Sequence, residues 1–125
     1  MVLAFALIGE AELHHRAVEA LAAADDLWAP ESINAELVNV LWLWVRHRGV
    51  EPAAAVEVLR DVEALLTGFV PIRQLWEQAL ALSIDHGHSS YDTLFVALAI
   101  ERGTTVLTDD RDLLERFPAH TTALT

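Results

Sequence analysis

The sequence predicts an α/β fold with a short parallel sheet and helices on both of its faces. Segments with helical spacing of apolar residues alternate with short apolar and β-branched runs. The strand candidates are separated by helices, and such crossover connections are typical of parallel strands. The chain has 125 residues and 54% apolar residues, enough for one core and too few residues for two. We therefore expect a single domain over residues 1–125.

The helices are predicted from apolar spacing and from the residues at their ends. Gly49 and Gly103 suit helix C-termini, and Pro52 is typical of a first turn. Ser89 and Ser90 are candidate N-caps. The predicted helices cover residues 11–24, 31–49, 52–68, 73–86, 91–102 and 110–117.

Short apolar runs between the helices predict the strands. The strand candidates are residues 27–29, 69–72, 104–108 and 121–124. The opening MVLAFALIG is apolar, but it lacks a basic leader and is too short to cross a bilayer. We interpret it as the buried start of the domain and expect no membrane segment.

Composition excludes several classes of function. The absence of cysteine excludes disulfides and thiolate sites and fits a cytoplasmic protein. All eight basic residues are arginine, so a Walker-type phosphate loop and a Schiff-base enzyme are excluded. The net charge of −11 argues against direct binding of a nucleic acid unless cations mediate it. A solvated surface, a basic protein partner and a metal site remain as explanations for the excess acid.

Several acids follow the predicted strands or begin the predicted helices. In an open parallel sheet the site lies beyond the C-terminal ends of the strands, which is where Asp109 and Asp110 follow VLT. Asp92 falls in the first turn of the preceding helix, near the same edge. Glu36 and Asn39 are three residues apart and share one face of an earlier helix. These side chains could therefore converge.

Each acid also has a structural interpretation. The helix dipole alone favours Asp92 in a first turn, by roughly 0.3–1 kcal/mol. Taken singly, Asp109, Asp110 and Asp112 are typical turn and capping residues. Glu36 lies in a helix that is apolar nearly all round, which predicts burial, and a buried carboxylate requires a partner or a function.

A cluster of carboxylates would require neutralisation. Two of them at about 4 Å repel by about 4 kcal/mol at an effective dielectric of 20, so protons or cations must offset the charge. Oxygen ligands favour Mg²⁺ or Mn²⁺ over zinc or copper. Such ions activate water and stabilise charge on a phosphoryl group. Phosphodiester hydrolysis is the natural reaction class.

Two segments resemble a known family. SSYDTLFVALAIERGTTVLTDDRDLL resembles the C-terminal half of PIN domains, in particular the toxin nucleases of VapBC toxin–antitoxin pairs, and PESINAELVNVLW resembles their middle segment. The resemblance implies a three-layer α/β/α fold with Glu36, Asp92 and Asp110 as catalytic, metal-binding acids. Asp112 then corresponds to an auxiliary metal-binding acid, with Thr108 and Asn39 as auxiliary site residues. The resemblance further implies a Mg²⁺- or Mn²⁺-dependent endoribonuclease that cleaves RNA, forms a homodimer and binds a cognate antitoxin.

The N-terminus departs from the family pattern. Family members begin with a strand that ends in the first acid, in a pattern like V-D-A-S, before a helix resembling VLAFALIGE. Here that strand and its aspartate have no counterpart, so we expect four strands where the family has five. Glu10 and Glu12 follow the apolar segment and do not replace the acid. A start further upstream, a natural truncation and a trimmed chain are the alternatives, and another subunit or a shifted strand would have to compensate.

Histidines and tryptophans give weaker signals. His86 and His88 flank Gly87 with a spacing that suits zinc, but without a third distant ligand a solvated loop is the favoured interpretation. Trp42 and Trp44 lie on nearly opposite sides of one helix, which indicates either a dimer interface or a central, fully packed helix.

Two hypotheses from different classes remain. In the first, the protein is a metal-dependent ribonuclease that uses Glu36, Asp92 and Asp110. In the second, it is a catalytically degenerate or truncated domain that serves as a protein-interaction module.

Overall fold

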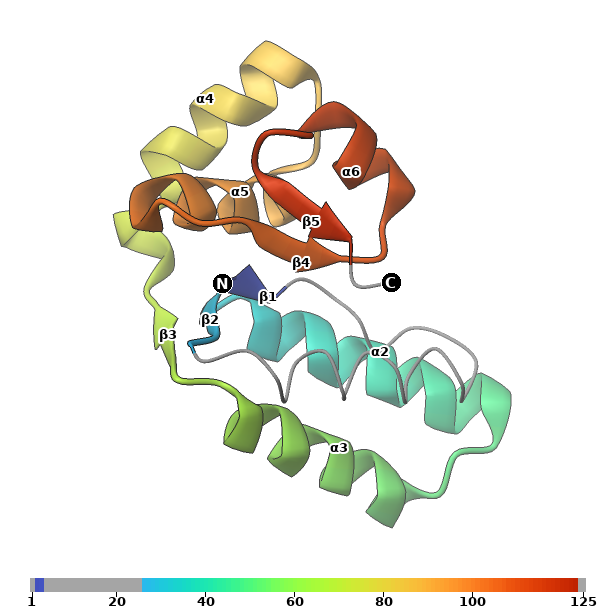
Figure 1. The fold of residues 1–125 in the computed structure, drawn as a ribbon. Coiled ribbons are helices and arrows are strands. Elements are labelled where there is room, and N and C mark those ends of the chain that lie inside the picture. Colours follow the sequence, from blue (N-terminus) through green and yellow to red (C-terminus); the bar gives the residue numbers. More distant parts are fainter. Residues whose placement is uncertain (1, 4–25, 124–125) are drawn as a thin grey trace.

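Parallel strands form the sheet on which the other elements pack (Figure 1). The computed structural model describes residues 2–3 and 26–123, and the helix predicted over residues 11–24 lies outside them. The strand order within the described residues is β3-β2-β1-β4-β5, and all pairs are parallel. The strands are β1 (Val2–Leu3), β2 (Trp28–Pro30), β3 (Gly68–Val70), β4 (Val106–Thr108) and β5 (Thr121–Ala123).

Helices cover both faces of this sheet, as predicted. Figure 1 shows α2 and α3 on one side and α4 and α5 on the other, with α6 beside β5. The helices are α2 (Ile33–Arg48), α3 (Pro52–Leu65), α4 (Trp76–His86), α5 (Ser90–Arg102) and α6 (Arg111–Arg116), with a 3₁₀ turn η1 (Ile72–Gln74) before α4. The α/β class with a short parallel sheet is thus confirmed.

The expectation that the first strand is missing is wrong. Val2 pairs with Trp28 of β2 on one side and with Val106 of β4 on the other, and Leu3 pairs with Leu107. These two residues therefore occupy the centre of the sheet. Without them the facing backbone groups of β2 and β4 would lose partners, which is costly when such groups are buried.

Most element ends follow the predicted signals. Gly103 ends α5 with a φ of +64°, a conformation that glycine adopts without steric cost. Ser89 caps α5, because its hydroxyl oxygen accepts a hydrogen bond from the backbone N–H of Tyr91. Gly68 differs from the prediction: it begins β3 rather than ending α3. A Cβ at this position would lie 2.6 Å from a ring carbon of Trp28, so the sheet needs glycine there for packing.

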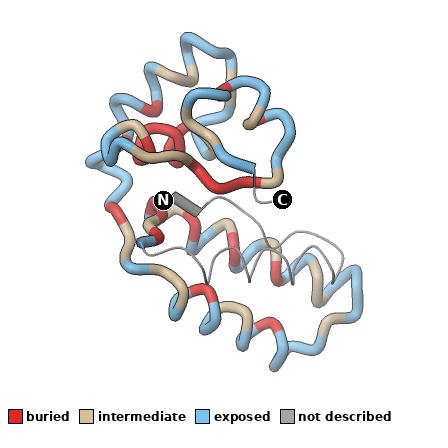
Figure 2. The backbone as a smooth tube through the Cα atoms, in the orientation of Figure 1, coloured by how far each residue is buried: buried red, intermediate tan, exposed pale blue. Residues whose placement is uncertain are grey.

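Helix α5 lies at the centre of the core. Every residue from Thr93 to Ala99 is buried (Figure 2). The Thr93 hydroxyl donates a hydrogen bond to the carbonyl of Ala79 at 2.9 Å, and it lies 2.7 Å from Ser83 Oγ. These contacts join α4 to α5 inside an otherwise apolar interior.

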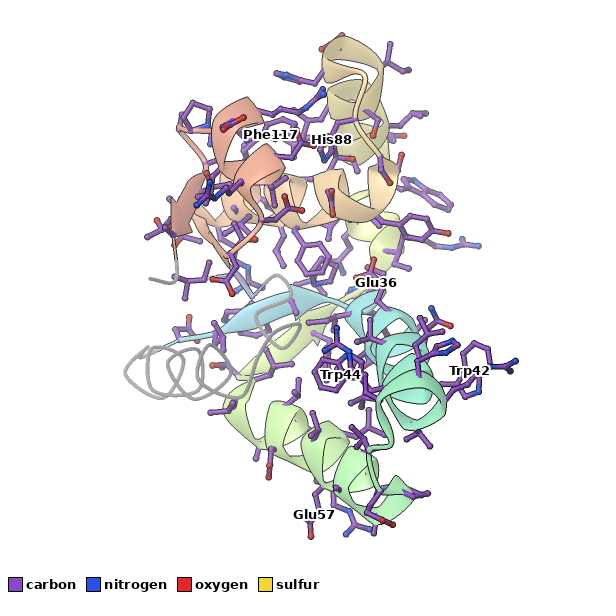
Figure 3. All side chains as sticks on the ribbon, turned by 90° about the vertical axis from the view of Figure 1, so that its right-hand side faces the viewer. Glu36, Trp42, Trp44, Glu57, His88 and Phe117 are labelled. Carbon is purple, nitrogen blue, oxygen red and sulfur yellow. The ribbon has the colours of Figure 1, made fainter. Side chains whose placement is uncertain are left out.

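Helix α2, by contrast, is buried along one stripe. Its buried residues are Ile33, Leu37 and Leu41, which are four residues apart. The expectation of nearly all-round burial is wrong, because Trp42 is 54% exposed while Trp44 packs against the core. Figure 3 shows the two tryptophans on opposite sides of the helix. None of the helices in the described ranges is long and apolar enough to cross a membrane.

Candidate active site

The strand order indicates where a site should lie. Chain connections run from β1 toward β2 and β3 on one side, and β4 and β5 lie on the other, so the order reverses between β1 and β4. In such sheets ligands bind beyond the C-terminal ends of the strands at the reversal. Three segments meet this edge: the start of α2, the start of α5 and the turn after β4. Helix α2 follows β2, and α5 leads from this edge back to the start of β4.

An open groove of about 500 Å³ brings two of the predicted acids together. Glu36 contributes from the first turns of α2 and Asp92 from the first turn of α5. Figure 3 shows Glu36 on the side of α2 that faces the α5 layer. The groove is lined by Ala35, Glu36, Asn39, Val40, Tyr91 and Asp92.

The electrostatic environment of Glu36 is unusual for a carboxyl group. Burial, and in second place the negative charge of Asp92, raises the pKa of Glu36 from 4.5 to about 7. Both causes act against the ionised form, since burial removes water and a like charge repels. A carboxyl group held in this way is typical of a functional site.

Asp92 is held by a histidine. Its Oδ2 lies 2.7 Å from Nε2 of His88, which is four residues earlier and separated from it by the N-cap Ser89. On the other side of the ring, Nδ1 of His88 lies 3.7 Å from Oδ2 of Asp112. Asp112 in turn accepts a hydrogen bond from Nε of Arg116 at 2.9 Å. Charged and polar groups therefore extend from Asp92 to the surface of α6.

Asp110 serves as the N-cap of α6. Its Oδ1 accepts hydrogen bonds from the backbone N–H groups of Asp112 at 2.9 Å and Leu113 at 3.3 Å. The N–H of Asp110 itself donates to Oγ1 of Thr108, which is buried at the end of β4. Thr108 thus orients the turn that carries Asp110, while one carboxylate oxygen of Asp110 is used for capping.

Glu36 and Asp92 converge as the sequence predicted, but the full set of acids does not. Within residues 2–3 and 26–123, no three histidine or acidic side chains are grouped closely enough to hold one metal ion. The central strand β1 is followed in the sequence by Ala4, so position 4 supplies no carboxylate.

The donors at the groove nevertheless fit a hard divalent cation. Glu36 and Asp92 offer carboxylate oxygens and Asn39 an amide oxygen, which are ligands that Mg²⁺ and Mn²⁺ accept. Ser32, one turn before Glu36, has a buried hydroxyl without a hydrogen-bond partner among the described residues. A cation would also offset the repulsion between Glu36 and Asp92. Two carboxylates and one amide oxygen therefore fit such an ion, and Asp110 does not join them in this conformation.

Two features of the site escaped the sequence analysis. The interpretation of the His86–His88 loop as solvated is wrong for His88, whose side chain is only 7% exposed. The spacing of four residues between His88 and Asp92, around an N-cap serine, is the signal that indicates this contact. Asp109, interpreted as a turn residue, is partly buried, and this burial raises its pKa.

The parallel sheet, with Glu36 and Asp92 in a groove at its C-terminal edge, defines an α/β domain with an acidic candidate site. The family model described as PIN domain matches residues 2–119, so the chain belongs to the PIN domain family. It is also 30% identical, over 110 residues, to Ribonuclease VapC3 of Pyrobaculum aerophilum, covering 86% of this chain and 84% of that protein. These findings identify a VapC-type PIN domain and support a nuclease.

Proposed function

We propose that this protein is a Mg²⁺- or Mn²⁺-dependent endoribonuclease that acts in the cytoplasm as the toxin of a toxin–antitoxin pair. The observation that carries the proposal is the juxtaposition of Glu36 and Asp92 in one groove at the C-terminal edge of the sheet. Membership of the PIN domain family and the similarity to a ribonuclease support it.

In this proposal Glu36 and Asp92 hold the ion from two different helices. Asp110 is the third acid and approaches from the turn after β4, where Thr108 orients its backbone. Asp112 is an auxiliary acid behind Asp92, linked to it through His88. Asn39 adds a polar group to the wall of the groove. A bound divalent ion would supply positive charge for the scissile phosphate and lower the pKa of a coordinated water.

An exposed aromatic residue in the groove favours an unpaired RNA strand as the substrate. Tyr91 lines the groove and is 68% exposed, so its ring is available for stacking against an unpaired base. The chain carries a net charge of −11, so the cation has to offset the repulsion of the phosphates. Binding of RNA is therefore expected to depend on the divalent ion.

The proposal is tested by measuring cleavage of a mixed-sequence RNA. The wild-type chain is assayed with Mn²⁺ and with EDTA, and the Asp92→Asn variant is assayed with Mn²⁺. We expect cleavage with Mn²⁺, none with EDTA, and a loss of roughly 10²–10³-fold in Asp92→Asn, the size expected when one transition-state stabilising group is removed. Glu57→Gln is the matched control, because it removes one exposed acid on α3, far from Glu36 (Figure 3). A folded wild-type chain that cleaves no RNA with Mn²⁺, nor with Mg²⁺ in its place, would contradict the proposal.

A second candidate is a catalytically degenerate domain that acts as an interaction module. Two observations favour it: Ala4 follows the central strand, and the described residues lack a cluster of three metal ligands. This candidate predicts a folded chain that cleaves nothing with Mn²⁺ or Mg²⁺ but still binds a basic partner. The cleavage experiment therefore separates the two candidates.

The proposed antitoxin is a basic protein that reaches the acidic groove. The net charge and the pair of acids support such a partner. Oligoarginine serves as a probe, measured by calorimetry without RNA. We expect binding that weakens in both Glu36→Gln and Asp92→Asn but not in Glu57→Gln; equal binding to all four chains would contradict a role for the groove.

The proposed homodimer is supported by an apolar stripe on α4 and the turn before it. The stripe residues are four apart and exposed: Ile72, Trp76, Leu80 and Ile84. Exposed apolar stripes of this kind mark protein interfaces. Sedimentation equilibrium should report a dimer for the wild-type chain and a monomer for Leu80→Arg, and a wild-type monomer at micromolar concentration would contradict the homodimer.

A further inference from the structure

We infer that His88 is a positioning residue: it holds the carboxylate of Asp92 in the orientation that the proposed site uses. The inference rests on the proposed function, because Asp92 is one of its two converging acids. His88 has no role in the proposed function: it is not one of the predicted site acids, and it is not proposed to contact RNA.

The contact between the two side chains is short and directional. Nε2 of His88 lies 2.7 Å from Oδ2 of Asp92. An ionised carboxylate only accepts hydrogen bonds, so Nε2 of the histidine is protonated and donates the hydrogen bond to Asp92. His88 thereby uses Oδ2 and leaves Oδ1 of Asp92 for a cation. The same division, with one carboxylate oxygen toward the ion and its neighbour toward a hydrogen-bond donor, orients ligands in many metal sites.

The surroundings of His88 prevent the ring from turning away. Its side chain is 7% exposed. The ring of Phe117 lies nearly perpendicular to the His88 ring, with the two ring centroids 5.7 Å apart (Figure 3). Its backbone N–H donates to the carbonyl of Ser83 in the turn that ends α4. Gly87, with a φ of +61°, gives the chain the left-handed turn that brings His88 back toward α5.

The far side of the ring connects to the auxiliary acid. Nδ1 of His88 lies 3.7 Å from Oδ2 of Asp112, and Arg116 holds the other oxygen of that carboxylate. His88 therefore lies between two predicted site acids that come from α5 and α6. The hydrogen bond to Asp92 is the contact that a residue filling space beside Phe117 would not need.

Three variants of the full chain test the role. His88→Ala removes the donor, and His88→Gln restores an N–H at the position of Nε2. His86→Ala is the matched control, because His86 also packs on Phe117, with ring centroids 4.6 Å apart, but contacts neither acid. Mn²⁺ affinity is measured from the electron paramagnetic resonance signal of free Mn²⁺, and kcat and KM from RNA cleavage. Circular dichroism confirms that each variant is folded.

We expect His88→Ala to weaken Mn²⁺ binding by about 10–100-fold, as is usual when a partner behind a metal ligand is removed. Its kcat should fall while KM for RNA stays near the wild-type value. His88→Gln should recover most of both losses, and His86→Ala should match the wild type. Wild-type Mn²⁺ affinity in His88→Ala would overturn the inference. A His88→Gln variant no better than His88→Ala would assign the ring a packing role only.

If the protein is not a metal-dependent ribonuclease, these measurements give a different result from the one expected for a failed positioning role. In that case the folded wild-type chain binds no Mn²⁺ and cleaves no RNA, and the positioning role is overturned with it. Imidazole ¹⁵N shifts of His88 in the metal-free chain report the contact itself. They should change in Asp92→Asn, and unchanged shifts would overturn the inference even if the wild type is an active nuclease.

Discussion

Helices α2 and α5 each contribute one acid to the groove, but the protein holds them in opposite ways. In α5, seven consecutive residues from Thr93 to Ala99 are buried, and the acid lies at the capped first turn, bonded to His88. In α2, only the stripe of Ile33, Leu37 and Leu41 is buried, and the acid is partly buried in the groove.

The difference shows two ways to place a carboxylate. Asp92 is oriented by a hydrogen bond on a rigid helix, so its position depends on specific partners. Within the described ranges, no hydrogen bond or ion pair holds the side chain of Glu36, and its ionised form is disfavoured by burial and by Asp92. Substitutions on α5 should therefore affect stability strongly, and those on the outer face of α2 weakly.

The largest expected effect is that of Leu98→Ala in the middle of α5. Leu98 is fully buried, so its truncation removes apolar contacts and leaves a cavity. We expect a loss of about 2–5 kcal/mol in the free energy of unfolding, measured by urea denaturation. Leu43→Ala, at an exposed position of α2 outside the proposed dimer stripe, is the control for the same chemical change. A loss below about 1 kcal/mol in Leu98→Ala would contradict the central position of α5.

Thr93→Val tests the polar contact that joins α5 to α4. The variant keeps the shape of the side chain but removes the donor to the carbonyl of Ala79. The partner Ser83 also loses a contact. We expect a loss of about 1–3 kcal/mol in the free energy of unfolding. If Thr93→Val is as stable as the wild type, the two helices are held together by apolar packing alone.

Local signals in the sequence predict most of the fold. Pro52 and Gly103 mark element ends because proline and glycine restrict or permit backbone angles whatever the rest of the chain does. Strand β1 was missed for the opposite reason. Two residues, Val2 and Leu3, carry no periodicity, and their strand conformation depends on pairing with β2 and β4. Long-range pairing of this kind leaves no mark within the segment.

The candidate site is predictable only where local signals in the sequence indicate it. Asp92 is predicted from its place in the first turn of a helix, and Glu36 from its place inside a largely apolar helix. The strand order brings both helix starts to one edge. His88 was missed because its burial depends on Phe117, which is distant in the sequence. The end of the strand VLT and the family resemblance both predict Asp110 as a site residue. In the structure it caps α6 through local hydrogen bonds, as the structural interpretation of Asp110 alone predicts.

Glu36→Gln should stabilise the protein at neutral and alkaline pH. The pKa of Glu36 is about 7 in the folded protein, against 4.5 as its ordinary value, so the folded state binds more protons between these values. By linkage, stability falls as the pH rises through that window, and it stays lower above it. Glutamine removes this loss, so the variant should have a higher Tm at pH 8 and an unchanged Tm at pH 4. A lower Tm at pH 8 would show that the ionised carboxylate has a stabilising partner.

The smallest expected effect is that of Trp42→Ala on the outer face of α2. Trp42 is 54% exposed, and its ring lies under the guanidinium of Arg46 at 5.6 Å. An exposed cation–π contact contributes about 0.5–1 kcal/mol, so the loss in the free energy of unfolding should stay within that range. Trp44→Ala is the comparison on the same helix, since Trp44 packs against the core and should cost more. If Trp42→Ala instead cost several kcal/mol in a concentration-dependent manner, Trp42 would be covered in an assembly. The contrast between α2 and α5 would then hold only for the isolated chain, because a second subunit would bury the face of α2 that its own fold leaves exposed.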